Sequence, residues 1–151
     1  MASEFFVSSN VVFGKDAAKK LPEILKEYKA KNVMVVYDAG VKMAGIATKV
    51  LGEIEKADVK VTVFDGVIPN PTNEVVEEAA GGGSSIDLTK AVNILMTNPG
   101  PIGQYGGIGM VKEDVLPLIA IPTTAGTSSE ITNVVALTDT EAVCKYVIID
   151  N

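Results

Sequence analysis

Short apolar runs alternate with helical apolar patterns along most of this chain, and no other feature restricts its fold as much. Residues 33–37 form a continuous apolar run rich in β-branched side chains, which predicts a buried strand ending at Asp38. Residues 41–56 carry apolar side chains at helical spacing, and residues 59–64 predict a second strand. The alternation predicts an α/β fold in which helices cover both faces of a parallel sheet.

The remaining periodic segments predict further helices and short strands. The expected elements are helices over residues 16–30, 72–80 and 86–96, strands over residues 116–121, 134–137 and 146–149 with a hairpin over 138–145, and a short strand pair within residues 5–13. With 151 residues the chain is long enough for one domain with a core. Parallel sheets bind ligands at the carboxyl ends of their strands, so the residues after each run are the candidates for a site.

Charge and composition exclude several kinds of function. The 13 Lys and Arg residues and 19 Asp and Glu residues give a net charge of −6, which argues against a nucleic-acid partner or an anionic membrane surface. No apolar run approaches the ~20 residues of a membrane span, and the first residues lack the pattern of a secretory signal. The single cysteine, Cys144, allows no internal disulfide, so we expect a cytoplasmic protein.

The absence of histidine restricts the chemistry further. A transition-metal site made of imidazole or thiolate ligands cannot form, and a Ser-His-Asp triad is excluded. A carboxylate site for Mg²⁺ stays open, although no cluster of acidic residues indicates one.

A glycine-rich segment, Gly81-Gly82-Gly83-Ser84, precedes the helix expected over residues 86–96. Gly82 and Gly83 leave backbone N–H groups accessible to a phosphate, because glycine has no Cβ atom. Ser84 can cap the helix, with Asp87 at the spacing of a capping box, and the helix dipole favours an anion such as a dinucleotide pyrophosphate. The alternative is a flexible joint between two helices, since the G-x-G-x-x-G pattern is missing.

A second polar segment, residues 122–130, follows the third expected strand. Its hydroxyl groups could contact a phosphate or the nicotinamide carboxamide, and Gly126 permits close approach of the backbone. The alternative is a Ser/Thr turn that leads into a helix.

Three single residues complete the candidates. Asp38 could accept hydrogen bonds from both hydroxyls of an adenosine ribose, or could cap a helix. Asn70 could line an adenine pocket or belong to an ordinary loop, and Lys145 could be a site residue or a solvated surface charge.

Several of these segments resemble the iron-containing (group III) alcohol dehydrogenases, whose superfamily also includes glycerol dehydrogenase and dehydroquinate synthase. The resemblance implies a Rossmann-like nucleotide-binding domain over residues 1–151, with a GGGS loop in place of G-x-G-x-x-G. It rests on FFVSSNVVFG at residues 5–14, the Val36-Tyr37-Asp38 and Asn70-Pro71-Thr72 segments, GGGSSID at residues 81–87 and IPTTAGTSSEIT at residues 121–132.

The resemblance also implies roles for single residues. Gly82, Gly83 and Ser84 would hold the pyrophosphate, and Asp38 the adenosine ribose, which favours NAD over NADP. The other implied cofactor contacts are Asp87 near the nicotinamide, Thr123, Thr124, Thr127 and Ser128, and Lys145 near the nicotinamide ribose. Family members transfer hydride between a primary alcohol and an aldehyde with the help of Fe²⁺, and many form homo-oligomers.

The chain departs from the family pattern in two places. The all-helical domain that supplies the metal ligands is expected after Asn151 and is absent from the sequence. A helix–strand segment is expected between Ala80 and Gly81, where either a segment has been left out or a genuine deletion has rearranged the sheet. Without the central strand, its neighbours would lose backbone hydrogen bonds.

The sequence therefore predicts the nucleotide-binding part of an NAD- and iron-dependent alcohol dehydrogenase, without turnover as this chain alone. A glycerol dehydrogenase-like relative is one alternative. A non-catalytic NAD-binding module or scaffold is another.

Overall fold

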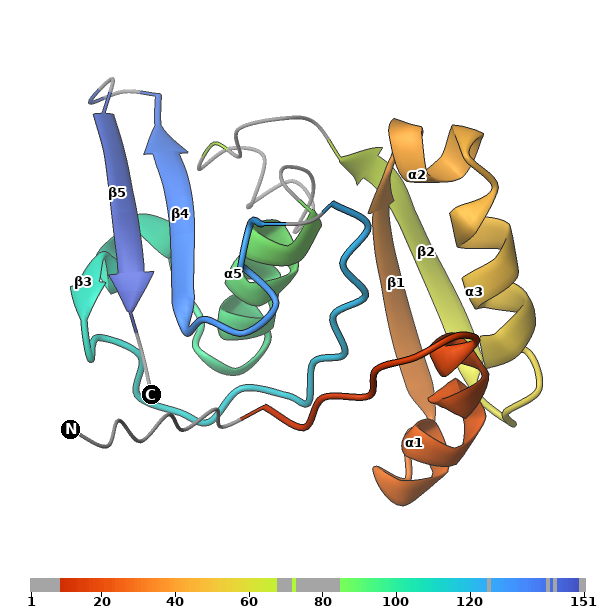
Figure 1. The fold of residues 1–151 in the computed structure, drawn as a ribbon. Helices are drawn as coiled ribbons and strands as arrows, with labels where there is room; N and C mark the ends of the chain where they lie inside the picture. Colours follow the sequence, from red (N-terminus) through yellow and green to blue (C-terminus); the bar gives the residue numbers. More distant parts are fainter. Residues whose placement is uncertain are drawn as a thin grey trace, which may run out of the picture.

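The structure is a computed structural model that describes residues 9–67, 72, 85–124, 126–140, 142 and 144–149 (Figure 1). None of the helices in these ranges has the length and apolarity needed to cross a membrane.

The first two expected strands are confirmed as a parallel pair. β1 comprises Asn32–Asp38 and β2 comprises Lys60–Val67. Their register runs from Asn32 opposite Lys60 to Val36 opposite Phe64, and it shifts before Asp38. The carboxyl ends of both strands therefore meet at one end of the pair.

Two of the expected helices are divided, so the predictions of single helices there are wrong. The segment 41–56 consists of α2 (Ala39–Met43) and α3 (Ile46–Ile54). Gly45 separates them with a φ of +69°, a left-handed conformation that ends a helix. The segment 16–30 consists of the 3-10 turn η1 (Ala17–Lys20) and the helix α1 (Leu21–Glu27).

Two glycines of this region should respond in opposite directions to alanine. Gly45→Ala places a Cβ atom at a φ of +69° and should lower the free energy of unfolding by about 1 kcal/mol. Gly52→Ala lies inside α3 with nothing within 4 Å of the new Cβ atom, and it should raise that free energy by roughly 0.5–1 kcal/mol. Urea denaturation measures both, and a loss of stability in Gly52→Ala would contradict the open helical environment of this residue.

The second half of the molecule is built around α5 (Ser85–Thr97), which confirms the helix expected over residues 86–96. It packs against β4 (Val134–Asp139) and β1. β4 and β5 (Cys144–Ile149) form the expected antiparallel hairpin. A short strand, β3 (Gly107–Ile108), follows the 3-10 turn η2 (Ile102–Tyr105) and pairs in parallel with β5.

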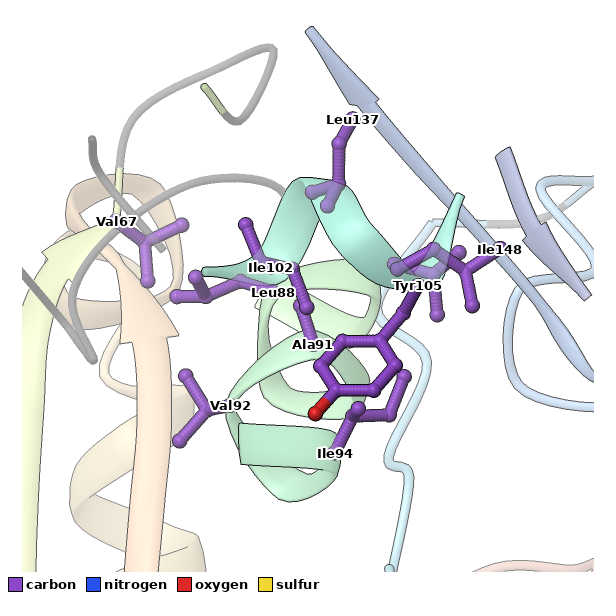
Figure 2. Close-up of a cluster of buried hydrophobic side chains, with 10 residues drawn as sticks. Val67, Leu88, Ala91, Val92, Ile94, Ile102, Tyr105, Leu137 and Ile148 are labelled. Carbon is purple, nitrogen blue, oxygen red and sulfur yellow. The ribbon is translucent and has the colours of Figure 1, made fainter. Parts of the chain in front are cut away.

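The main core surrounds α5 and joins the two sheets (Figure 2). Leu88 and Ala91 of α5 have no exposed surface, and they belong to one cluster with Leu137 of β4, Ile148 of β5 and Val67 of β2. A second cluster packs α1 and α3 on the other face of the β1–β2 pair. This arrangement confirms an α/β fold in which helices cover both faces of a parallel sheet.

The strand expected over residues 116–121 is a wrong prediction, because the segment is irregular and its Leu116 and Leu118 side chains are exposed. A strand needs a neighbour to complete its backbone hydrogen bonds, and the described ranges supply none at this place. Residues 10–13 are also irregular, so the strand expected there is wrong for that part. Residues 5–8 and 73–80 lie outside the described residues, and Thr72 forms a bridge with Thr138.

Candidate functional site

A cleft with a volume of about 670 Å³ opens between β1, α5 and the segment of residues 116–124. One end of it is lined by Asp38, the last residue of β1, and by Ser85, the first residue of α5. The two elements meet there in Figure 1. The carboxyl ends of parallel strands bind ligands, and the N-terminus of a helix attracts anions, so this end is the candidate site. Its polar lining consists of Asp38, Ser85, Asp87, Thr123, Thr124, Thr127 and Ser129.

Asp38 connects the two elements that meet at this end. Its Oδ1 atom accepts a hydrogen bond of 2.9 Å from the backbone N–H of Val41, which caps α2. Its Oδ2 atom accepts one of 3.4 Å from the hydroxyl of Ser85, the first residue of α5. The capping role that the sequence left open is therefore real, and the second carboxylate oxygen faces the start of α5.

An ion pair lies near Asp38 but does not involve it. The Lys42 ammonium group donates a hydrogen bond to the Asp65 carboxylate at the end of β2. This bond lowers the pKa of Asp65 and raises the pKa of Lys42, and both side chains are exposed. Because Lys42 is held by Asp65, no ion pair of the described residues neutralises Asp38.

Asp87 lies in the first turn of α5, and its buried Oδ1 atom has no hydrogen-bond partner among the described residues. The ammonium group of Lys90 is 3.8 Å away and donates instead to the carbonyl oxygens of Thr132 and Val134, each at 2.9 Å. Burial lowers the pKa of Lys90, and the carboxylates of Asp87 and Glu130 oppose this shift. Asp87 thus keeps an acceptor oxygen that no described group uses.

Asp87→Asn should lower the pKa of Lys90 further, because the substitution removes a carboxylate that favours the charged amine. The folded pKa of Lys90 already lies below its ordinary value of 10.5, so the unfolded chain binds this proton more tightly. The contribution of Lys90 to the free energy of unfolding therefore falls as pH drops from 10.5 through the folded pKa. In Asp87→Asn the folded pKa is lower still, so this fall should continue to a lower pH. An NMR titration of the lysine ε-carbons measures the shift, with the exposed Asp58→Asn as control; an unchanged Lys90 pKa would contradict the pairing.

The structure brings some of the expected site residues together and leaves others apart. Thr127 lines the cleft with Thr123 and Thr124, and its hydroxyl donates to Glu130 at 3.3 Å. Ser128 has a φ of +58° and Lys145 lies on β5 opposite Thr138, and neither lines the cleft. The remaining expected residues, Asn70, Gly82, Gly83 and Ser84, lie outside the described residues.

Two asparagines that the sequence analysis missed hold the segment leading into the cleft wall, and the wall's first residue, near α5. Asn98 is 3% exposed, and its amide oxygen accepts from the backbone N–H groups of Lys112 and Glu113 at 3.0 and 2.9 Å. Its amide nitrogen donates to the carbonyl oxygen of Glu113 at 2.9 Å. Asn93 donates to the carbonyl oxygen of Leu116 at 2.7 Å and accepts from its N–H at 3.1 Å. For Asn98, an amide directly after an apolar helix was the available signal.

The residues present do not fit the iron that the family resemblance implies. The sequence has no histidine and a single cysteine. In the part of the chain that the structure describes, no three His, Cys, Asp or Glu side chains lie close enough to share a metal ion.

Comparison with known proteins identifies the family of this chain. A family model described as iron-containing alcohol dehydrogenase matches residues 8–81 and, separately, residues 79–151. Alcohol dehydrogenase 4 of Saccharomyces cerevisiae strain S288c is 34% identical over 161 residues, which cover 97% of this chain and 42% of the relative. NAD-dependent methanol dehydrogenase of Bacillus methanolicus is 33% identical over 162 residues, with coverages of 98% and 42%.

A solved structure of 1,3-propanediol oxidoreductase superimposes with a TM-score of 0.89 and 32% identity, over 99% of this chain and 43% of that chain. This chain therefore spans less than half the length of the proteins it matches. Since the family model matches nearly all of its residues, the chain belongs to the iron-containing alcohol dehydrogenase family.

Proposed function

We propose that this chain is the nucleotide-binding part of an NAD-dependent alcohol dehydrogenase that uses iron. One observation carries the proposal: the hydrogen bond of 3.4 Å between Ser85 and Asp38, which brings the start of α5 to the carboxyl end of β1. A helix N-terminus beside a carboxylate at a strand end suits the phosphates and the ribose of an adenosine diphosphate group. The helix attracts the phosphates, and the carboxylate accepts hydrogen bonds from the ribose hydroxyls.

In this proposal, Asp38 accepts hydrogen bonds from the adenosine ribose and repels a 2′-phosphate, so that NAD binds better than NADP. The Gly82-Gly83-Ser84 loop directly precedes α5 and would hold the pyrophosphate, with Asn70 near the adenine. The cleft position of Asp87, Thr123, Thr124 and Thr127 supports contacts with the nicotinamide half. Contacts from Ser128 and Lys145 would need these residues to approach a cleft that they do not line.

The dinucleotide would supply hydride transfer between a primary alcohol and an aldehyde in the complete enzyme. This chain provides no ligand set for the iron, so we expect cofactor binding without turnover from these 151 residues. We further propose a cytoplasmic protein that associates with copies of itself and binds neither nucleic acid nor membranes.

The second candidate is a non-catalytic NAD-binding module or scaffold. As a binding module it would share the cofactor site and would take part in no hydride transfer. A glycerol dehydrogenase-like parent is the third candidate, and the substrate profile of the complete enzyme separates it from the first.

Calorimetric titration with NAD⁺ and NADP⁺ tests the proposal. We expect saturable binding of NAD⁺, weaker binding of NADP⁺, and about tenfold loss of NAD⁺ affinity in Asp38→Asn, since a hydrogen bond to a charged group contributes about 1.5 kcal/mol. Asparagine can still cap α2, so the variant removes the charge and keeps the fold.

Asp58→Asn is the matched control, because it removes the same charge from an exposed position outside the cleft. Absence of NAD⁺ binding in folded protein would contradict the proposal. Equal affinity of NAD⁺ and NADP⁺ would contradict the role of Asp38.

A further inference from the structure

The cleft continues from the polar site into an apolar groove that follows the open edge of β1. All 7 residues of β1 line the cleft. Neighbouring side chains of a strand point to opposite faces of a sheet, so one cavity reaches all of them only along the edge of the strand. In the described ranges, β1 is paired with β2 alone, and this second edge has no ladder partner.

Both faces of the groove are covered by helices. Leu21 and Leu25 of α1 lie on one face, where they pack in one cluster with Val33 and Val35. Val92 and Met96 of α5 lie on the other face. A strand placed in this groove would therefore be covered on both faces, as the central strand of a parallel sheet is.

The far wall of the groove is the irregular segment of residues 116–121, all of which line the cleft. It runs in the same direction as β1 (Figure 1). The hydrogen bonds of Asn93 to Leu116 fix its first residue against α5. Its apolar side chains are exposed, including Leu118 at 41% and Ile121 at 38%, although their sequence is typical of a buried strand.

We propose that this β1 groove, defined by the edge of β1 and residues 116–121, binds an extended, uncharged apolar peptide of about six residues as an added parallel strand. The occupant would form backbone hydrogen bonds with β1 on one side and with residues 118–121 on the other. This groove adjoins the proposed cofactor contacts at Asp38, and its apolar part does not depend on them.

The comparison with relatives favours a peptide strand over other occupants. The alignment with methanol dehydrogenase extends over 162 positions, whereas the whole chain has 151 residues, so at least 11 positions have no counterpart here. The family match is interrupted at residues 79–81, where one matched range ends and the next begins. The break at residues 79–81 suits an additional segment in the relatives, and this supports a strand that this chain would accept from outside.

The test uses a synthetic peptide of six alternating valine and alanine residues flanked by lysines and labelled with a fluorophore. We expect saturable binding by fluorescence anisotropy. Methylation of the central backbone nitrogens should weaken binding at least tenfold, because it removes ladder hydrogen bonds and keeps the apolar surface. Equal affinity of both peptides, or no binding to folded protein, would overturn the proposal.

A pair of matched variants locates the site. Met34→Lys places a charge on the β1 edge inside the groove and should weaken peptide binding at least tenfold. Met43→Lys makes the same change at an exposed position of α2 outside the cleft and should leave binding unchanged. Equal effects of the two variants would contradict the location.

Sedimentation of the chain alone tests whether a second copy of the chain occupies the groove. A tight dimer that the peptide does not dissociate would assign the groove to a second copy and overturn the proposal.

Discussion

We expect Leu88→Ala to lower the free energy of unfolding by about 3–5 kcal/mol. Leu88 has no exposed surface and lies in the cluster that joins α5 to both sheets (Figure 2). Its truncation removes buried methyl groups and leaves a cavity in a cluster whose members come from different elements and cannot all close it. The effect is large compared with the 5–15 kcal/mol that stabilises an ordinary domain.

Chemical denaturation followed by circular dichroism measures this loss. Leu95→Ala is the control, because it makes the same substitution on the same helix at a partly buried position. We expect a clearly smaller loss there. Equal losses in the two variants would show that the core around α5 is not packed as described.

Asn98→Ala should lower the free energy of unfolding by about 2–4 kcal/mol. The substitution removes three hydrogen bonds to the backbone of Lys112 and Glu113, from a side chain that is only 3% exposed. These backbone groups have no other partner in the described hydrogen bonds, so the segment after η2 should detach from α5.

Asn93→Ala removes two comparable bonds to Leu116 at a more exposed place and should cost about 1 kcal/mol. Hydrogen exchange of the Glu113 amide gives an independent reading. It should accelerate strongly in Asn98→Ala and only slightly in Asn93→Ala. Unchanged protection of Glu113 in Asn98→Ala would contradict the role of this side chain.

The strands and the long helix could be predicted because their patterns are local. The β-branched run that became β1, the run that became β2 and the stripe of α5 all carry their periodicity within a few residues. The failure at residues 116–121 has a non-local cause. Their apolar sequence suits a central strand, but a strand forms only when neighbours supply hydrogen bonds, and sequence periodicity does not report whether a neighbour exists. The break at Gly45 depended on one left-handed residue inside a helical pattern.

Part of the site could be predicted for a similar reason. Asp38 ends a strand of the parallel pair, as its apolar run predicts. The Thr-rich segment follows an apolar run that is not a strand, and it lines the same cleft. The contact of Ser85 with Asp38 and the pairing of Lys90 with Asp87 were not predictable, because the first joins residues 47 apart and the second depends on how deeply α5 is buried. The role of Lys145 near the nicotinamide ribose is implied by the resemblance alone, and its place on β5 opposite Thr138 does not bring it to the cleft.

The most direct test of the account is a titration of the ¹⁵N-labelled chain with NAD⁺, followed by amide chemical shifts. If the end of β1 and the start of α5 hold the dinucleotide, saturable shifts should concentrate at Asp38, Val41, Ser85 and Thr124, while Asn32 at the opposite end of β1 stays unchanged. Shifts that concentrate at Asn32, or a spectrum that NAD⁺ does not change at all, would contradict a cofactor site at this end of the sheet.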